Sequence, residues 1–175
     1  MLSLRSLALT LVAIVITMTT AISTKAVYAM DGHIHHGSLM ISDAVMRAVL
    51  PGGKVTAAYM TITNTSTQDE ALVSVSYNGA KKSEIHTMEV VNDVMKMRPI
   101  DGVLTIPAGG SVMLQPGGLH LMFMGLTDKP KAGDEATISL DFENAGPLTM
   151  TIPVQKIMGG HKKSSDHNHD HNHDQ

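Results

Sequence analysis

Apolar and polar residues alternate in short runs along the middle of this chain, a pattern typical of half-buried β-strands. Turn-forming sequences rich in Gly, Pro, Asn and Asp separate the runs, and no stretch keeps a helical period over three turns. Many short strands joined by such turns predict an all-β fold, either a sandwich or a barrel. The predicted strands are residues 57–63, 71–77, 103–106, 111–114, 136–142 and 148–154.

The alternation also predicts which side chains share a face. Within residues 71–77 it places Val73, Val75 and Tyr77 on one face, because side chains two apart in a strand point the same way. Residues 143–146, Glu-Asn-Ala-Gly, are predicted to close a hairpin between the last two strands. Methionine commonly fills irregular cores, and four methionines are predicted to do so here: Met46, Met60, Met113 and Met150.

The first 29 residues have the features of a secretory signal peptide. Arg5 supplies a positive charge, residues 7–21 are almost wholly apolar, and residues 27–29, Val-Tyr-Ala, offer a cleavage site. The apolar run is shorter than the roughly 20 residues that a membrane-spanning helix needs. We therefore expect cleavage after Ala29 and export, most simply to a bacterial periplasm, with no membrane segment left in the mature protein.

The remaining chain divides into three parts. Residues 30–38 form a short His-rich segment, residues 39–155 carry the predicted single domain, and residues 156–175 form a low-complexity tail that we expect to be disordered. Loss of residues 1–29 changes the formal charge from −3 to −5. No basic patch is present that could neutralise phosphates, so we expect no nucleic-acid partner. We also expect a monomer.

Both ends of the mature chain offer histidines to a metal. Imidazole that alternates with Asp and Asn suits Cu(II), Ni(II) or Zn(II) better than Cu(I). The alternative is an expression tag or a tail that only improves solubility. The candidate ligands are His33, His35 and His36 in the N-terminal segment, and His161, His167, His169, His171 and His173 in the tail.

The chain has 14 methionines, 10 histidines and no cysteine. Only two histidines lie inside the predicted domain, and each begins a His-x-Met sequence: His86 with Met88, and His120 with Met122. Residues two apart share a strand face, so each pair can present nitrogen and sulfur together. The same spacing recurs in Met95 and Met97, and in Met122 and Met124. Core packing is the alternative for any single methionine.

These donor atoms favour a soft metal. Thioether sulfur prefers Cu(I), whereas Mg²⁺ and Ca²⁺ prefer clustered oxygen ligands and structural zinc sites use Cys and His. A blue-copper electron-transfer centre needs a Cys thiolate, which the chain lacks. We find no nucleophile paired with a base and no phosphate-binding loop. We therefore expect a metal carrier and no enzyme.

Four segments together resemble the PCuAC family of periplasmic copper chaperones. They are residues 85–88 (Ile-His-Thr-Met), 94–100, 106–110 (Ile-Pro-Ala-Gly-Gly) and 114–126, and the resemblance extends over residues 43–154. It implies a cupredoxin-like Greek-key β-sandwich with Cu(I) held by two histidines and two methionines. The ligands it implies are His86, Met97, His120 and Met122.

Three other methionines remain alternatives. Met95 shares a face with Met97, which the resemblance favours because it directly precedes Arg98-Pro99. Met88 and Met124 are alternates, entry-path sulfurs or packing residues. By resemblance, the His-rich extension would bind Cu(II).

The resemblance also implies a partner. Copper would pass to the binuclear copper centre of cytochrome c oxidase, directly or through a thiol-containing assembly protein. A protein that sequesters copper without delivery would use the same ligands. A nickel or zinc scavenger driven by the tail is the third hypothesis.

Overall fold

The computed structural model describes residues 32–157, so the predicted signal peptide and the histidines of the tail lie outside the described residues. The described chain is all-β, as predicted, and contains no helix. Its strands are β1 (His33–His36), β2 (Leu39–Arg47), β3 (Val55–Asn64), β4 (Glu70–Tyr77), β5 (Lys82–Val91), β6 (Val94–Pro99), β7 (Leu104–Ile106), β8 (Ser111–Leu114), β9 (His120–Met124), β10 (Glu135–Phe142) and β11 (Gly146–Gln155).

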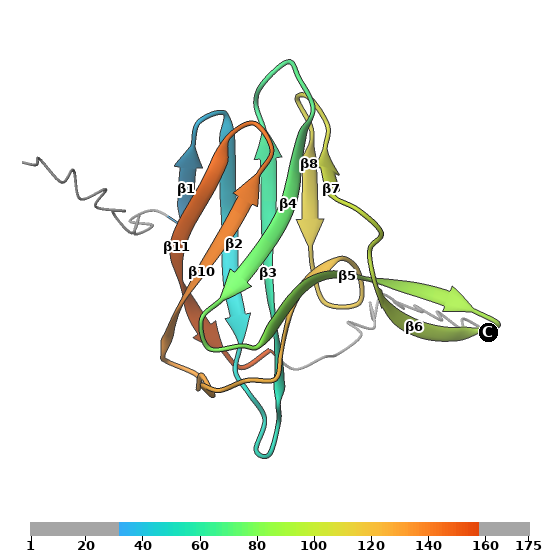
Figure 1. Ribbon diagram of the computed structural model, residues 1–175, viewed down its shortest axis with the longest axis vertical. Coiled ribbons are helices and arrows are strands. Elements are labelled where there is room, and N and C mark those ends of the chain that lie inside the picture. Colours follow the sequence, from blue (N-terminus) through green and yellow to red (C-terminus); the bar gives the residue numbers. More distant parts are fainter. Residues whose placement is uncertain (1–31, 158–175) are drawn as a thin grey trace, which may run out of the picture.

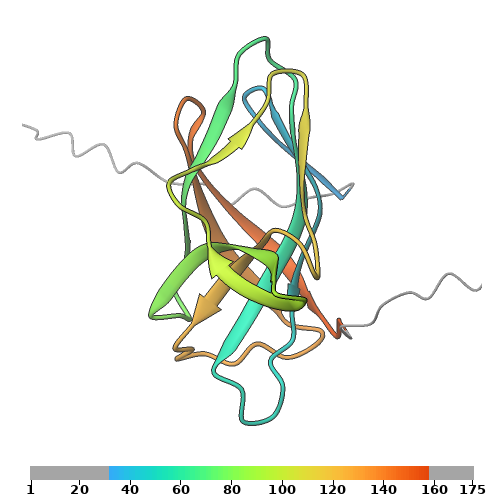
Figure 2. The same cartoon turned by 90° about the vertical axis from the view of Figure 1, so that its right-hand side faces the viewer.

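The strands form two packed layers (Figures 1 and 2). One layer has the order β7-β4-β10-β11, and the other has the order β6-β5-β9-β3-β2, with β1 paired to β2 and β8 paired to β3. Strand β11 joins them, because it pairs antiparallel with β10 and, at Val154 and Gln155, parallel with β2. This is the predicted β-sandwich.

Alternating side chains of both layers fill the space between them. The largest fully buried ones include Phe123, Leu121, Ile138 and Leu140, and each such side chain contributes about 1.5–3 kcal/mol when it leaves water. The predicted core positions Met46, Met60 and Met150 are confirmed. The prediction for Met113 is wrong: this side chain is 57% exposed on β8, which packs its other face inward through Leu114.

The prediction that Val73, Val75 and Tyr77 share one face of β4 is also partly wrong. Val75 and Tyr77 are buried, but Val73 is exposed and Leu72 takes the inward position. The cause is a shift of register between β4 and β10, since Ser74 pairs with Asp141 whereas Leu72 pairs with Phe142. The extra residue in β4 reverses the alternation, as a β-bulge does.

Glu70, at the start of β4, ties this strand to the predicted hairpin between β10 and β11. Its Oε1 accepts the backbone N–H of Ala71 at 2.8 Å and of Asn144 at 2.9 Å, and its Oε2 accepts that of Ala145 at 2.9 Å. Burial raises the pKa of this carboxyl, but the bonds from Asn144, Ala71 and Ala145 outweigh burial and hold the pKa below its usual range. Glu70 therefore stays ionised inside the fold.

The His-rich segment belongs in part to the sandwich. Strand β1 pairs antiparallel with β2, and Ile34 is buried between exposed His33 and His35. His36 lies on the face of Ile34, where its Nε2 is 3.0 Å from the carbonyl oxygen of Ala145. The three histidines therefore do not share one face.

Strands β5 and β6 form a hairpin that projects from the sandwich (Figures 1 and 2). Its two turn residues, Asn92 and Asp93, have φ angles of 53° and 61°, as the central positions of a type I′ turn require. Every residue of β6 is exposed. Among residues 32–157 there is no helix long and apolar enough to cross a membrane.

Candidate metal centre

Three neighbouring strands bring the predicted ligands together. Strand β5 lies between β6 and β9. In this register His86 is opposite His120, and Met88 is opposite Met97. Met122 lies two residues from His120 on the same strand and therefore on the same face. Ligands that lie far apart in the sequence thus converge at one end of the sheet.

A cleft of about 180 Å³ opens at this point. Met88, Met97, His120 and Met122 all line it. The predicted ligand His86 does not itself line the cleft; it is buried next to His120, with the two ring centroids 5.9 Å apart. The other lining residues were not predicted as part of the site, and they include Arg47, Tyr59 and Ile157.

His120 is fixed by the loop that precedes it. Its Nδ1 is 2.9 Å from the carbonyl oxygen of Gly118, and because a carbonyl only accepts, Nδ1 carries the proton and Nε2 keeps its lone pair. Gly117, with a φ of 81°, allows the turn that brings this carbonyl into place. Burial lowers the pKa of His120. The hydrogen bond to Gly118 acts in the opposite direction, whereas the nearby His86 and Arg47 lower the pKa further. The ring is therefore neutral at neutral pH.

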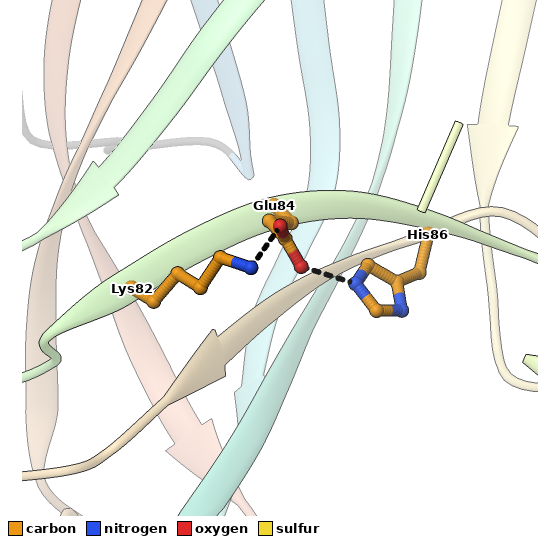
Figure 3. Close-up of polar contacts among 3 residues, drawn as sticks. All are labelled: Lys82, Glu84 and His86. Carbon is orange, nitrogen blue, oxygen red and sulfur yellow. Dashed lines mark hydrogen bonds and ion pairs between the residues drawn. The ribbon is translucent and has the colours of Figure 1, made fainter. Parts of the chain in front are cut away.

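His86 is held from its own strand. Its side chain is buried, and its Nε2 is 2.9 Å from Oε2 of Glu84 (Figure 3). The other carboxylate oxygen, Oε1, is 2.6 Å from Nζ of Lys82. Hydrogen bonds with Lys82 and then His86 lower the pKa of Glu84. The remaining ring nitrogen, Nδ1 of His86, is buried without a hydrogen-bond partner, and such an atom calls for an explanation.

The methionines divide into two groups. Met88 and Met122 are half-buried in the cleft, and Met97 reaches it from β6 although 47% of its surface is exposed. Met95 is opposite Val90, further out on the hairpin, and Met124 is opposite Lys82; neither lines the cleft. The geometry thus favours Met97 over Met95 as the candidate ligand from β6. Of the two remaining alternates, Met88 lies in the cleft and Met124 does not.

A hard-ligand site is absent from the described part of the chain. Within residues 32–157, no group of three or more His, Cys, Asp or Glu side chains could hold a metal ion. This includes the N-terminal histidines, of which only His33 and His35 share a face. The cleft instead offers Nε2 of His120 and a set of thioether sulfurs, and the unpartnered Nδ1 of His86 belongs to the neighbouring ring.

The sequence analysis did not assign Glu84 to the site. A Glu-x-His sequence in a strand places carboxylate and imidazole on one face, and this was the available signal. Arg47, Tyr59 and Ile157 gave no such signal, because they reach the cleft only through the pairing of distant strands.

The fold and the donor atoms define a class: a β-sandwich domain with a candidate soft-metal site of His and Met side chains at the end of one sheet. Residues 39–154 match the family described as "Putative lipoprotein LpqE-like". The solution structure of apo-DR1885 from Deinococcus radiodurans is 32% identical and superposes with a TM-score of 0.55 over 78% of this chain and 91% of that chain. The chain belongs to the LpqE-like family, and, as the sequence predicted, it has the fold of PCuAC domains.

Two further solved structures and one further protein are also similar to this chain. The copper-bound PCuAC domain from PmoF2 shares the fold, with a TM-score of 0.61 and 22% identity over 71% of this chain and 98% of that chain. The solution structure of CuI-DR1885 is 36% identical over 66% of this chain and 77% of that chain, with a TM-score of 0.53. "Putative lipoprotein Lxx21020" of Leifsonia xyli subsp. xyli (strain CTCB07) is 28% identical over 124 residues, which are 71% of this chain and 74% of that protein.

Proposed function

We propose that this protein is an exported copper chaperone that carries Cu(I) on His86, Met97, His120 and Met122. The observation that carries the proposal is the pairing of His86 with His120 beside the methionine-lined cleft. Two imidazoles with thioethers form a soft ligand set that suits Cu(I). The likeness to the copper-bound PmoF2 domain and to CuI-DR1885 supports the choice of metal.

The site is suited to transfer. Met97 lies on a projecting hairpin and is half exposed, so a ligand of a partner can approach the metal from this side. The proposed acceptor is the binuclear copper centre of cytochrome c oxidase, or a thiol-containing copper-assembly protein in the periplasm. The protein binds and releases copper as a monomer without chemical turnover.

Deletion of the gene tests delivery. We expect oxidase activity to fall in low-copper medium and to recover when the intact gene is restored, whereas a gene with both His86→Ala and His120→Ala should not restore it. Normal oxidase activity combined with sensitivity to high copper would contradict delivery and indicate sequestration.

Met97→Leu should weaken Cu(I) binding at least about tenfold, whereas Met95→Leu should leave it unchanged. Leucine keeps the approximate volume of methionine, so the substitution costs little stability but removes the sulfur that binds Cu(I). Competition with a Cu(I) chelator under anaerobic conditions measures both affinities. Equal weakening by the two substitutions would contradict the assignment of Met97.

Removal of residues 158–175 tests the proposed Cu(II) site of the tail. We expect the truncated protein to keep one equivalent of Cu(I) and to lose tight Cu(II) binding, because the two ligand sets differ in softness. Isothermal titration with Cu(II), Ni(II) and Zn(II) provides the comparison. A tail that prefers nickel or zinc over copper would favour the scavenger hypothesis instead.

A further inference from the structure

The two nitrogens of the buried His86 ring have different surroundings. Nε2 is 2.9 Å from a carboxylate oxygen of Glu84. Nδ1 has no hydrogen-bond partner, and it is the one buried side-chain nitrogen or oxygen of residues 32–157 in this condition. His86 is only 7% exposed and its Nδ1 atom is buried, so water does not compensate this nitrogen. One nitrogen is thus anchored and the other is left without a hydrogen-bond partner.

The anchor determines where the proton lies. An ionised carboxylate only accepts hydrogen bonds, so Nε2 of His86 carries the proton and Nδ1 keeps its lone pair. Glu84 is itself held, because its second oxygen is 2.6 Å from Nζ of Lys82 (Figure 3). Lys82, Glu84 and His86 alternate along β5 and therefore share one face. His120 has the opposite arrangement, with Nδ1 bound to Gly118 and Nε2 free.

We propose that Glu84 is a positioning residue that keeps His86 in the Nε2–H form, so that Nδ1 is the nitrogen that binds Cu(I). The copper part of this inference rests on the proposed function, whereas the tautomer is a property of the metal-free protein. A carboxylate behind a ligating histidine fixes the orientation of the ring and makes it a more basic ligand. The pair of histidines therefore presents Nδ1 of His86 and Nε2 of His120 to one ion.

The metal-free full chain tests the tautomer directly. Long-range ¹H–¹⁵N spectra of ¹⁵N-histidine-labelled protein at neutral pH distinguish protonated from unprotonated ring nitrogens. We expect protonated Nε2 and unprotonated Nδ1 in His86, and the reverse in His120. A spectrum in which His86 carries its proton on Nδ1 would overturn the inference without reference to copper.

Two variants test the consequence for binding. In Glu84→Ala, His86 should lose its single tautomer and Cu(I) affinity should fall about 10–100-fold. Glu89→Ala is the matched control: it removes another carboxylate of β5, whose ion pair with Arg98 is exposed and does not involve His86, so affinity should stay within about twofold of the parent protein. Thermal unfolding checks that both variants remain folded.

The outcomes separate this inference from the proposed function. If the parent protein binds no Cu(I), the proposed function is wrong. If it binds Cu(I) and Glu84→Ala binds equally tightly, only the role of Glu84 is wrong. Should Glu84→Ala fail to fold, the spectrum of the parent protein alone still decides the tautomer.

Discussion

Replacing His120 by alanine should weaken Cu(I) binding by more than about 100-fold. Loss of a group that only orients a ligand already costs about 10–100-fold in metal affinity, and His120 is proposed as a ligand itself. Its Nε2 is unprotonated and its ring is buried beside His86. Anaerobic competition with a Cu(I) chelator, at one equivalent of Cu(I) per protein, measures the change in affinity.

A matched control separates this site from the other histidines. His35 is exposed on β1 and belongs to a different part of the sandwich, so His35→Ala should leave Cu(I) affinity within about twofold of the parent value, as expected for a change away from the site. If His120→Ala retained the affinity of the parent protein while remaining folded, the assignment of the metal centre to the β5–β9 pair would be wrong.

The second large effect concerns stability. Glu70→Gln should lower the free energy of unfolding by about 3 kcal/mol at neutral pH, because hydrogen bonds to a charged group contribute about 1.5–3 kcal/mol and buried N–H groups left unpaired cost a similar amount. The variant amide has only one accepting oxygen for the backbone N–H groups of Ala71, Asn144 and Ala145. Glu143→Gln is the control, since Glu143 is exposed in the same turn.

The pH dependence of this difference has a definite sign. The pKa of Glu70 is lowered in the folded protein, so its stabilisation is present above the unfolded value of about 4.3 and is lost as pH falls through the folded value. Urea unfolding of the parent protein and of Glu70→Gln between about pH 7 and pH 3 should therefore show the difference in their free energies of unfolding shrinking toward acid pH. A gap that stays constant over this range would contradict the role given to the ionised carboxylate.

Much of the fold could be predicted from the alternation of residues. The six predicted strands correspond to β3, β4, β7, β8, β10 and β11, and the turn at residues 143–146 is a hairpin. Alternation fixes which residues share a face but not which face is inward, so Met113 was assigned to the core although it is exposed. It also cannot reveal the bulge that turns Val73 outward.

The candidate site was less accessible to sequence reasoning. The spacing of His-x-Met predicts that neighbouring donors share a face, but it does not predict that β5 pairs with both β6 and β9. That register depends on the packing of the whole sandwich. It brings His86 opposite His120, selects Met97 over Met95 as a lining residue, and adds Arg47 from β2.

The central claim is that one Cu(I) binds between His86, His120, Met97 and Met122. Its most direct test is NMR of the full chain labelled in methionine methyl carbons and histidine ring nitrogens, titrated anaerobically with one equivalent of Cu(I). We predict that Nδ1 of His86, Nε2 of His120 and the methyl groups of Met97 and Met122 shift together, whereas the buried Met46, Met60 and Met150 do not. Shifts confined to the histidines of the tail, or to Met95 and Met124, would contradict the account.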